Sequence, residues 1–436
     1  MPVASKAAGR QFPENDTLLL IAYSVPFVIV LVVQLAHAFS WSPGDFDTVK
    51  SYPATEWLIN YQGGFLRRGL PGSLLFMLMS VLQISPVLLT LLLSTGLFLV
   101  FCWYLFSSLR GLAPRWLLLT APLLGYPVYV DYILGRKDVL LVLLLALSLR
   151  LVVRSGDHWW CPFVVAMIMS VAVLSHESMA FVGLPALIAM ILLKTLTDFR
   201  GLWIFTVLKE CRRWVWLVVP IIAIGISLQR KGTLAQGQQI IDSLRFSLPP
   251  ASRYLGETGA IGWIGRPVEL YVSEAHDALG RLHFGVPTWI YLIAIASSGI
   301  VLTASVFVWR NDDAGVFFLL ACLFQLAAIM PLFYLAKDHG RWVSFSLLSA
   351  FVITIESTSS MRTFCFSRLL RPVASFLHAV PRPLPPIGLA FWGIPIGISS
   401  LHQIIYSAPA GSVLKVYFLL RVMGLPDPTA LWRQAG

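Results

Sequence analysis

Charged side chains are scarce in this sequence: of its 436 residues, 12% are charged and 57% are hydrophobic. Soluble domains carry about 25% charged residues. The shortage excludes an ordinary water-soluble domain and predicts a protein that crosses a membrane many times. The formal net charge of +11 is therefore interpreted through membrane topology and anionic lipid, and no nucleic-acid partner is expected.

Cysteine and the short motifs of many enzymes are also lacking. The five cysteines are irregularly spaced, and none falls in a segment expected outside the cytoplasm, which argues against disulfides and a zinc site. The sequence has no GxxxxGK[ST] phosphate loop, no HExxH zinc motif and no GxSxG nucleophile elbow. We expect no metal site and no cofactor, with a divalent metal kept as an open alternative.

Long apolar runs dominate what is present. A bilayer span needs about 17–25 apolar residues, and the sequence predicts an all-α, polytopic transmembrane helical bundle of about 11 spans. These are expected at residues 17–40, 87–108, 117–135, 139–154, 161–175, 179–196, 214–228, 287–309, 314–336, 343–356 and 386–407. No cleavable signal pattern precedes the first run, which is long enough to remain as a span.

The basic residues of the short loops set the expected orientation. Most of them fall on one side of the predicted spans, which the positive-inside rule assigns to the cytoplasm. We expect a multi-pass protein of the bacterial inner membrane with a cytoplasmic N-terminus. Residues 1–436 are predicted to form a single integral membrane domain. Its two sizeable outer elements are the first loop, residues 41–86, with a re-entrant or interfacial helix, and a long periplasmic loop, residues 229–285.

The first outer loop carries acids and paired arginines. Asp45 and Asp47 lie a few residues beyond the first span, and Arg67 and Arg68 follow the sequence Gly-Gly-Phe-Leu. A carboxylate just outside a membrane can take the proton of a sugar hydroxyl or hold a metal, and guanidinium groups match phosphate oxygens. We predict a catalytic role for Asp45 or Asp47 and substrate binding by Arg67 and Arg68. The alternatives are a helix cap for the acids and lipid-headgroup contacts for the arginines.

Two further clusters interrupt apolar runs at the outer ends of expected spans. Arg136 and Lys137 would hold an anion such as pyrophosphate, or else Arg136 and Asp138 would form an ion pair that fixes a helical hairpin. His176 and Glu177 break a nearly continuous apolar run, where ionisable residues are costly and usually functional. Because histidine titrates near neutral pH, we predict catalysis for His176 and Glu177 and substrate binding for Arg136 and Lys137.

The last cluster runs from Lys337 to Trp342. Asp338, His339 and Arg341 are predicted to bind substrate, with Arg341 on a phosphate group. An ordinary charged turn at the membrane surface is the alternative, and for His176 the alternative is structural pairing with an arginine. The predicted topology places all these clusters on the outer side, and we expect them to meet at one face.

An acidic first outer loop, many spans and outward Arg and His clusters resemble the integral-membrane glycosyltransferases of the GT-C type. These include bacterial O-antigen and exopolysaccharide polymerases and ligases. The resemblance is architectural and covers most of the chain. It implies a donor sugar linked to polyprenyl phosphate or pyrophosphate at the outer membrane face. Asp45 or Asp47 would match the acidic residue of the family's first loop, and the cations on the lipid phosphate would be Arg136, Arg341, Arg67 and Arg68.

The expected function is therefore a membrane glycosyltransferase or polysaccharide polymerase in exopolysaccharide, O-antigen or capsule biosynthesis. Glycosyl transfer leaves negative charge on the departing phosphate, which arginine and lysine stabilise. Polymerase and single-sugar transferase are equal alternatives. Two other classes stay open, a lipid or oligosaccharide transporter or flippase and a non-catalytic component of an envelope polysaccharide assembly complex. The expected partners are a polyprenyl-linked saccharide, membrane lipids and other polysaccharide assembly proteins.

Overall fold

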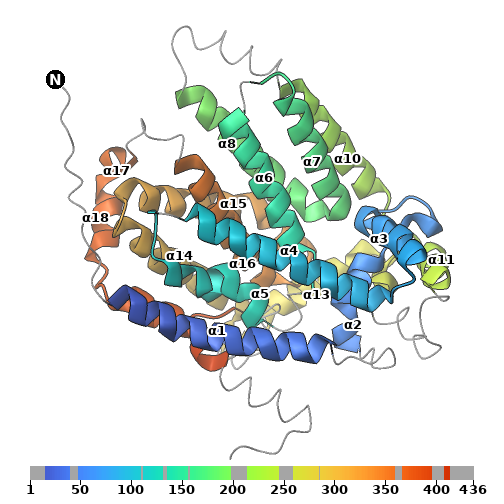
Figure 1. Ribbon diagram of the computed structural model, residues 1–436, viewed down its shortest axis with the longest axis horizontal. Helices are drawn as coiled ribbons and strands as arrows, with labels where there is room; N and C mark the ends of the chain where they lie inside the picture. Colours follow the sequence, from blue (N-terminus) through green and yellow to red (C-terminus); the bar gives the residue numbers. More distant parts are fainter. Residues whose placement is uncertain are drawn as a thin grey trace, which may run out of the picture.

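The chain folds into a helical bundle, seen in Figure 1. The computed structural model describes residues 15–39, 48–109, 111–130, 135–155, 158–197, 214–244, 259–283, 285–358, 366–394 and 407–412. Within these residues the strands are limited to an antiparallel pair, β1 (Leu282–His283) and β2 (Val286–Pro287). The predicted all-α class is confirmed at this level.

Several helices are long and apolar enough to cross a membrane. Five such segments occur in the described part of the chain, four in single helices and one that starts at Glu177 and runs into α8. Their helices are α1 (Asn15–Phe39), α4 (Pro86–Ser108), α8 (Gly183–Thr197), α14 (Thr288–Val308) and α15 (Asp312–Leu335). A bent pair, α10 (Val218–Gln229) and α11 (Leu234–Leu244), supplies a sixth if counted as one span. These helices support a membrane protein. The number of about 11 spans stays a prediction.

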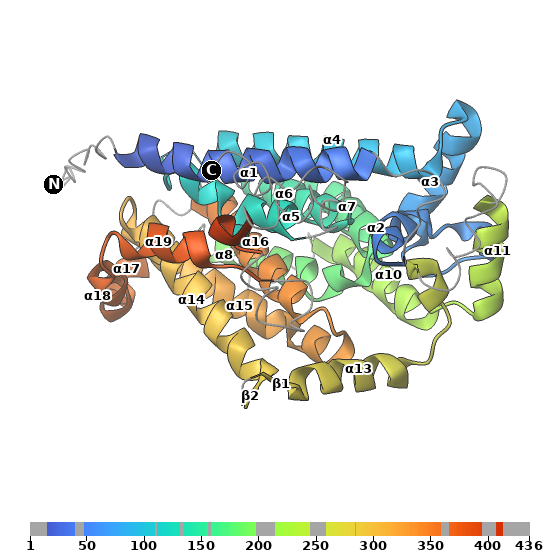
Figure 2. The ribbon, with the colours of Figure 1, turned by 90° about the horizontal axis from the view of Figure 1, so that it is seen from below.

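Helices α1 and α4 run side by side along one edge of the molecule (Figure 2). Both expose large hydrocarbon side chains, such as Leu18 and Val32 of α1 and Leu99 and Trp103 of α4. Apolar faces of this size are unusual on proteins in water and suit contact with lipid tails. This edge therefore has the composition of a lipid-facing surface.

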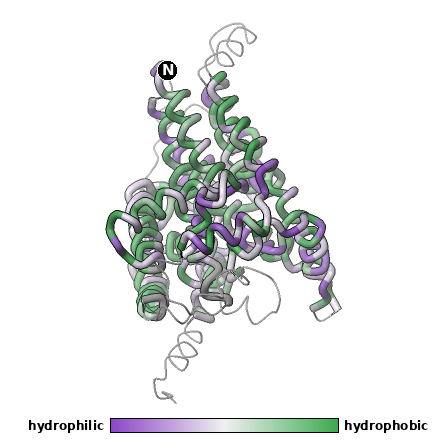
Figure 3. Tube along the Cα trace, turned by 90° about the vertical axis from the view of Figure 1, so that its right-hand side faces the viewer, coloured by the Kyte–Doolittle hydropathy of each residue, from purple (hydrophilic) through white to green (hydrophobic). Residues whose placement is uncertain are grey.

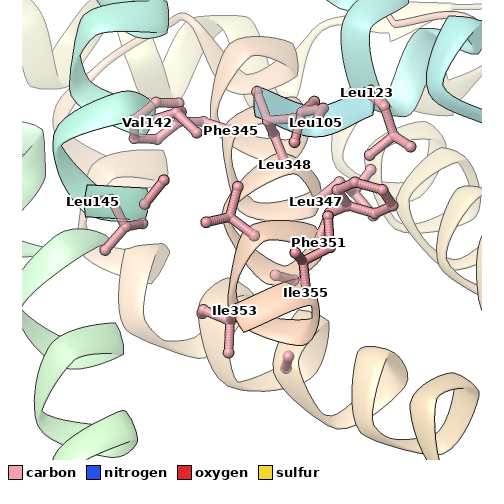
Figure 4. Packing of buried hydrophobic residues seen from close by; sticks show 14 of the residues in the cluster. Leu105, Leu123, Val142, Leu145, Phe345, Leu347, Leu348, Phe351, Ile353 and Ile355 are labelled. Atoms are coloured by element: carbon pink, nitrogen blue, oxygen red, sulfur yellow. The ribbon is translucent and has the colours of Figure 1, made fainter. Parts of the chain in front are cut away.

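Helix α16 (His339–Thr358) forms the centre of the bundle, and its side chains are buried from His339 to Ser357. It packs on α15, on α14 and on α6 (Asp138–Ser155). Figure 4 shows Phe345 and Phe351 of α16 among side chains such as Val142 of α6 and Leu105 of α4. Small residues in α16, including Ser346 and Ala350, let the neighbouring helices approach closely. The cluster of charges described below begins at one end of this helix.

Helices α2 (Thr48–Leu58) and α3 (Gly69–Leu82) of the predicted first loop lie at one end of the molecule (Figures 1 and 2). The turns η1 (Tyr61–Gly63) and η7 (Ala260–Trp263) pack there against α11 and α2, whereas α13 (Val268–Gly280) packs on α14 and α15. A second small core joins α2, α11 and η7 through Leu58, Ile240 and Ile261. The backbone N–H of Ala260 also donates to the hydroxyl of Thr55 at 2.8 Å. The first loop and part of the long loop therefore pack against each other through these elements.

The predicted span at residues 117–135 is wrong as a continuous helix. The chain there forms η2 (Arg115–Leu119), a π-helical turn η3 (Ala121–Gly125) and the short α5 (Tyr126–Tyr129). Proline lacks the N–H that continues a helix and crowds the preceding turn. Pro122 and Pro127 fall inside the predicted span and Pro114 stands before it, so an apolar composition is not enough to give one helix.

The remaining helices complete the bundle. They are α7 (Cys161–Ser175), η4 (Glu177–Ala180), η5 (Trp214–Leu217), α17 (Phe366–Leu369), α18 (Arg371–Ala379) and α19 (Leu384–Phe391). Helix α19 covers the start of the predicted span at 386–407, most of whose later residues lie outside the described part of the chain. Helix α13 falls within residues 229–285, the predicted long loop.

Candidate active site

Charged side chains from five segments meet near the end of the bundle that carries α2 and α3. The segments are α2, the turn before α3, the turn leading into α6, the break between α7 and η4, and the start of α16. Viewed from this end, hydrophilic segments gather among hydrophobic helices (Figure 3). We call the set the charged cluster: Glu56, Arg67, Arg68, Arg136, Lys137, Asp138, His176, Glu177, Asp338 and Arg341.

Glu56 lies at the centre of the charged cluster and is fully buried. Its Oε2 atom is 3.3 Å from Nε of Arg136, and its Oε1 atom is 3.4 Å from Nε2 of His176 and 3.8 Å from Nη2 of Arg341. Burial raises the pKa of this carboxyl, but the charges of Arg136 and Arg341 and the bond to His176 outweigh burial and hold the pKa well below its usual range. Glu56 is therefore an ionised carboxylate that connects three segments.

Arg341 and Asp138 form the most closely matched pair of the charged cluster. The Nε atom of Arg341 donates to Oδ2 of Asp138 at 2.8 Å, and its Nη2 atom donates to Oδ1, so the contact is forked. Both residues are buried. Forked guanidinium–carboxylate contacts combine strength with defined geometry. Because Asp138 is the first residue of α6 and Arg341 lies in the first turn of α16, this pair fixes the starts of the two helices against each other.

Asp338 lies at the edge of the charged cluster, where its side chain is 26% exposed. It reaches two buried arginines, with Oδ2 3.4 Å from Nη1 of Arg136 and 3.6 Å from Nη1 of Arg341. Both contacts are longer than the 2.8 Å bond between Arg341 and Asp138. Asp338 is thus the carboxylate most open to solvent among the cluster's ion pairs, and it is held more loosely than its buried neighbours.

Arg67 and Arg68 close the charged cluster on another side through Glu177. Nε of Arg68 donates to Oε2 of Glu177 at 2.8 Å, and Nη1 of Arg67 lies 3.4 Å from Oε1. Arg68 has φ +65°, a left-handed conformation that side chains other than glycine rarely adopt, and it directly precedes α3. Such backbone persists only when its surroundings hold it in place. Here the ion pair with Glu177 and the start of α3 supply that constraint.

Lys137 is fully buried, and its Nζ atom donates to the backbone carbonyl of Arg68 at 3.1 Å. It also lies 6.0 Å from the centre of the Trp57 ring. Burial, which disfavours the ammonium form, lowers the pKa of this amine to about 7. The side chain can therefore gain or lose a proton near neutral pH, which a solvent-exposed lysine does not do.

His176 contacts the charged cluster from the break between α7 and η4. Its Nδ1 atom accepts the backbone N–H of Ser178 at 3.1 Å, so the neutral ring carries its proton on Nε2, the atom that faces Glu56. Burial lowers the pKa of this imidazole to about 4, and the ring is neutral at physiological pH. His176 therefore turns its ring N–H toward Glu56 without adding positive charge.

The structure brings most of the predicted site residues together, but not all of them. His339 is buried with Nε2 3.0 Å from the carbonyl of Phe333, and its ring stacks on Phe333. Its hydrogen-bonding contact thus goes to the end of α15, and the charge of its neighbour Asp338 also acts on the ring. Asp45 and Asp47 lie outside the described residues. Their predicted catalytic role stays a prediction.

Glu56 is the residue that sequence reasoning missed. The signal was present, because this acid stands in a stretch, Tyr-Pro-Ala-Thr-Glu-Trp-Leu, with few other polar groups. The resemblance to GT-C enzymes instead favours Asp45 and Asp47, because they lie a few residues beyond the first predicted span. The structure shows that Glu56 contacts both Arg136 and Arg341, whereas its neighbour Trp57 anchors the same segment by donating to the carbonyl of Gly135 at 2.7 Å.

Five basic residues thus face four carboxylates, and each carboxylate already has a guanidinium partner. Among the described residues, no group of three or more potential ligands is arranged to hold a metal ion. Comparison with protein-family profiles, curated proteins and solved structures found no match to this chain. The charged cluster is therefore the feature that bears on function.

Proposed function

We propose that the protein is a glycosyltransferase or polysaccharide polymerase of the bacterial inner membrane. It takes a sugar from a polyprenyl-phosphate or polyprenyl-pyrophosphate carrier at the charged cluster, on the periplasmic side. The observation that carries the proposal is the position of Asp338, whose carboxylate bridges Arg136 and Arg341 at the exposed edge of a buried cluster. Each phosphate of the polyprenyl carrier is a diester with one negative charge, like a carboxylate, so a pyrophosphate brings two charges. The phosphate oxygens accept the same forked hydrogen bonds. A carrier phosphate would replace Asp338 between the two arginines.

The two arginines would then stabilise the leaving group. In glycosyl transfer the bond between the sugar carbon and the phosphate oxygen breaks, and the electron pair leaves with the phosphate. Preorganised guanidinium groups lower the free energy of that charge separation. Glu56 and Asp138 keep Arg136 and Arg341 in place before substrate arrives, since both carboxylates are buried and contact the guanidinium groups directly.

Asp338, released by the phosphate, would act as the base for the acceptor. Its exposed carboxylate takes the proton of an acceptor hydroxyl while the acceptor oxygen bonds to the sugar carbon. Asp45 and Asp47 are the other candidates for this role. Arg67 and Arg68 contact Glu177, and their side chains are 26% and 20% exposed. They would contact the second phosphate of a pyrophosphate carrier or lipid headgroups next to the carrier.

The test uses conservative substitutions that keep the positive charge but remove the forked hydrogen bonds of the guanidinium group. Arg136→Lys and Arg341→Lys are expressed in the native host, and surface polysaccharide and its lipid-linked precursor are measured at matched protein level. Loss of polymer with precursor accumulating in the outer leaflet is the expected result. Arg154→Lys is the matched control, because Arg154 is an exposed arginine at the far end of α6 and should leave polymer unchanged.

The location of the precursor separates the competing classes. Precursor that accumulates only in the inner leaflet would identify a flippase and overturn the proposal. Polymer that persists in both variants would show that the arginines only hold the fold together. A non-catalytic assembly component predicts that purified protein in liposomes transfers no sugar from a lipid-linked donor, whereas the proposal predicts transfer that both variants lose.

A further inference from the structure

A cavity of about 340 Å³ lies where the first turn of α1 meets the end of α4 and the loop before η2. It is at the far end of α4 from α3 and from the charged cluster. Its lining includes both polar and apolar side chains, among them Leu20, Phe106, Leu109, Arg115, Trp116 and Arg310. None of these residues takes part in the function proposed above, so the cavity is an independent feature of the molecule.

Positive charge exceeds negative charge in the lining of this cavity. Arg310 donates to Asp16 through Nη2 at 2.9 Å, which leaves the acid paired. Arg115 is exposed and adds a second guanidinium to the same cavity. With two arginines and one aspartate, the lining favours an anion over a cation or a neutral molecule.

Trp116 also lines the cavity and carries an indole N–H. The side chain is 1% exposed and stacks on Tyr23, with ring centres 5.3 Å apart. Its Nε1 atom is buried and has no acceptor among the described residues. Indole can only donate, and buried donors are nearly always satisfied in folded proteins. An anionic oxygen in the cavity would accept this N–H.

The apolar part of the lining indicates what carries the anion. Leu20 of α1 and Phe106 and Leu109 at the end of α4 line the cavity beside the arginines. The same two helices form the edge with exposed hydrocarbon side chains, including Leu18 and Trp103. A charged headgroup in the cavity would therefore have its acyl chains against this edge. Basic pockets between membrane helices at the interface suit such headgroups.

We propose that this cavity binds the phosphate of an anionic phospholipid, with Arg115, Arg310 and the N–H of Trp116 as its donors. The occupant is a membrane lipid from the face where α1 begins. The site is distinct from the charged cluster, and it would stand whether or not the protein transfers sugars.

The experiment measures binding of phosphatidylglycerol to the full-length protein in neutral detergent, by native mass spectrometry and by the shift in melting temperature. Trp116→Phe keeps the ring that stacks on Tyr23 and removes only the donor, and Arg115→Gln removes one exposed cation. Each change should weaken binding about ten-fold, the typical worth of a hydrogen bond to a charged group. Trp159→Phe and Arg154→Gln, both exposed and located neither on α1 or α4 nor in the lining of the cavity, should change binding less than about two-fold.

Two further arms identify the source of the phosphate. Phosphatidylcholine should bind much more weakly than phosphatidylglycerol, and inorganic phosphate should compete only in large excess. Effective competition by inorganic phosphate would keep the phosphate chemistry and assign the cavity to a soluble compound. Equal binding of both lipids, or unchanged binding of phosphatidylglycerol in both Trp116→Phe and Arg115→Gln, would overturn the proposal. If Trp116→Phe is unstable, Arg115→Gln carries the test alone because its side chain is exposed.

Discussion

The proton-bearing Nε2 atom of His176 lies 3.4 Å from Oε1 of Glu56. The contact joins the break between α7 and η4 to α2, two segments far apart in the sequence. A neutral imidazole here supplies a donor without adding positive charge, because burial keeps its pKa at about 4. The guanidinium groups of Arg136 and Arg341 then neutralise Glu56 from the other sides. Four separate segments therefore depend on one buried carboxylate.

Replacing Glu56 with Gln should destabilise the protein strongly. The amide leaves Arg136 and Arg341 without the buried charge that faces them, and breaking a buried pair in this way costs about 3–5 kcal/mol. The melting temperature of the purified protein in detergent measures the effect. Asp312→Asn is the control, because Asp312 pairs with His378 at a side chain that is 52% exposed and should change stability by less than about 0.5 kcal/mol. Equal stability of the two variants would contradict the central role of Glu56.

Replacing Asp338 with Asn should separate catalysis from folding. The side chain is 26% exposed and its contacts are long, so the melting temperature should stay close to that of the unchanged protein. Loss of a general base slows a reaction by about 10²–10⁴-fold, and kcat for sugar transfer should fall by that order. Glu274→Gln, an acid paired with exposed Lys337, provides the matched comparison. A normal kcat in the Asp338 variant would contradict the role of Asp338 as the general base and would assign that role to another carboxylate.

Stability should rise with pH above neutrality because of Lys137. Its pKa falls from an ordinary value of 10.5 to about 7 in the folded protein. Between these values the unfolded chain holds a proton that the folded protein lacks, so raising the pH favours folding. Each pH unit in this window contributes up to about 1.4 kcal/mol. Melting temperatures from pH 7 to pH 10 measure the slope, and Lys137→Met should flatten it. An identical slope in both proteins would contradict the burial of this amine.

Gly72 should not tolerate a side chain, whereas Gly96 should. A Cβ at Gly72 would lie 1.9 Å from the carbonyl oxygen of Ile59, but a Cβ at Gly96 meets nothing within 4 Å. Overlap with backbone forces α3 away from the chain that follows α2, at a cost of about 1–3 kcal/mol or more. Gly96→Ala lies within α4 and should be neutral or slightly stabilising. Thermal unfolding of both variants tests the contrast, and similar melting temperatures would refute it.

The sequence predicts the helical class and several helix positions well, because long apolar runs have few alternatives in a membrane. Helices α14 and α15 coincide closely with the expected spans at 287–309 and 314–336. The prediction of one helix at residues 117–135 is wrong, because the positions of proline within an apolar stretch decide whether a single helix forms. Length and composition also cannot decide which apolar helices cross the bilayer, so the number of spans stays a prediction.

Part of the candidate site was likewise within reach of the sequence. Unpaired charges in apolar surroundings are costly, and this reasoning selects Arg136, Lys137, Glu177 and Arg341 directly. Their ion-pair partners depend on tertiary packing, which the spacing of residues in the sequence does not reveal. Glu56 was therefore missed although it contacts two of the predicted arginines, and the contact of His339 with Phe333 was not foreseen.

The charged cluster also stands where several helices begin. Helix α3 starts directly after Arg68, α6 starts at Asp138, and α16 starts at His339. The first peptide N–H groups of a helix have no partner within it, and the aligned peptide dipoles place a partial positive charge at this terminus. Three such termini pointing at one region produce a positive potential that does not depend on any side chain. An anion arriving there would be attracted even in a variant that has lost one of its arginines.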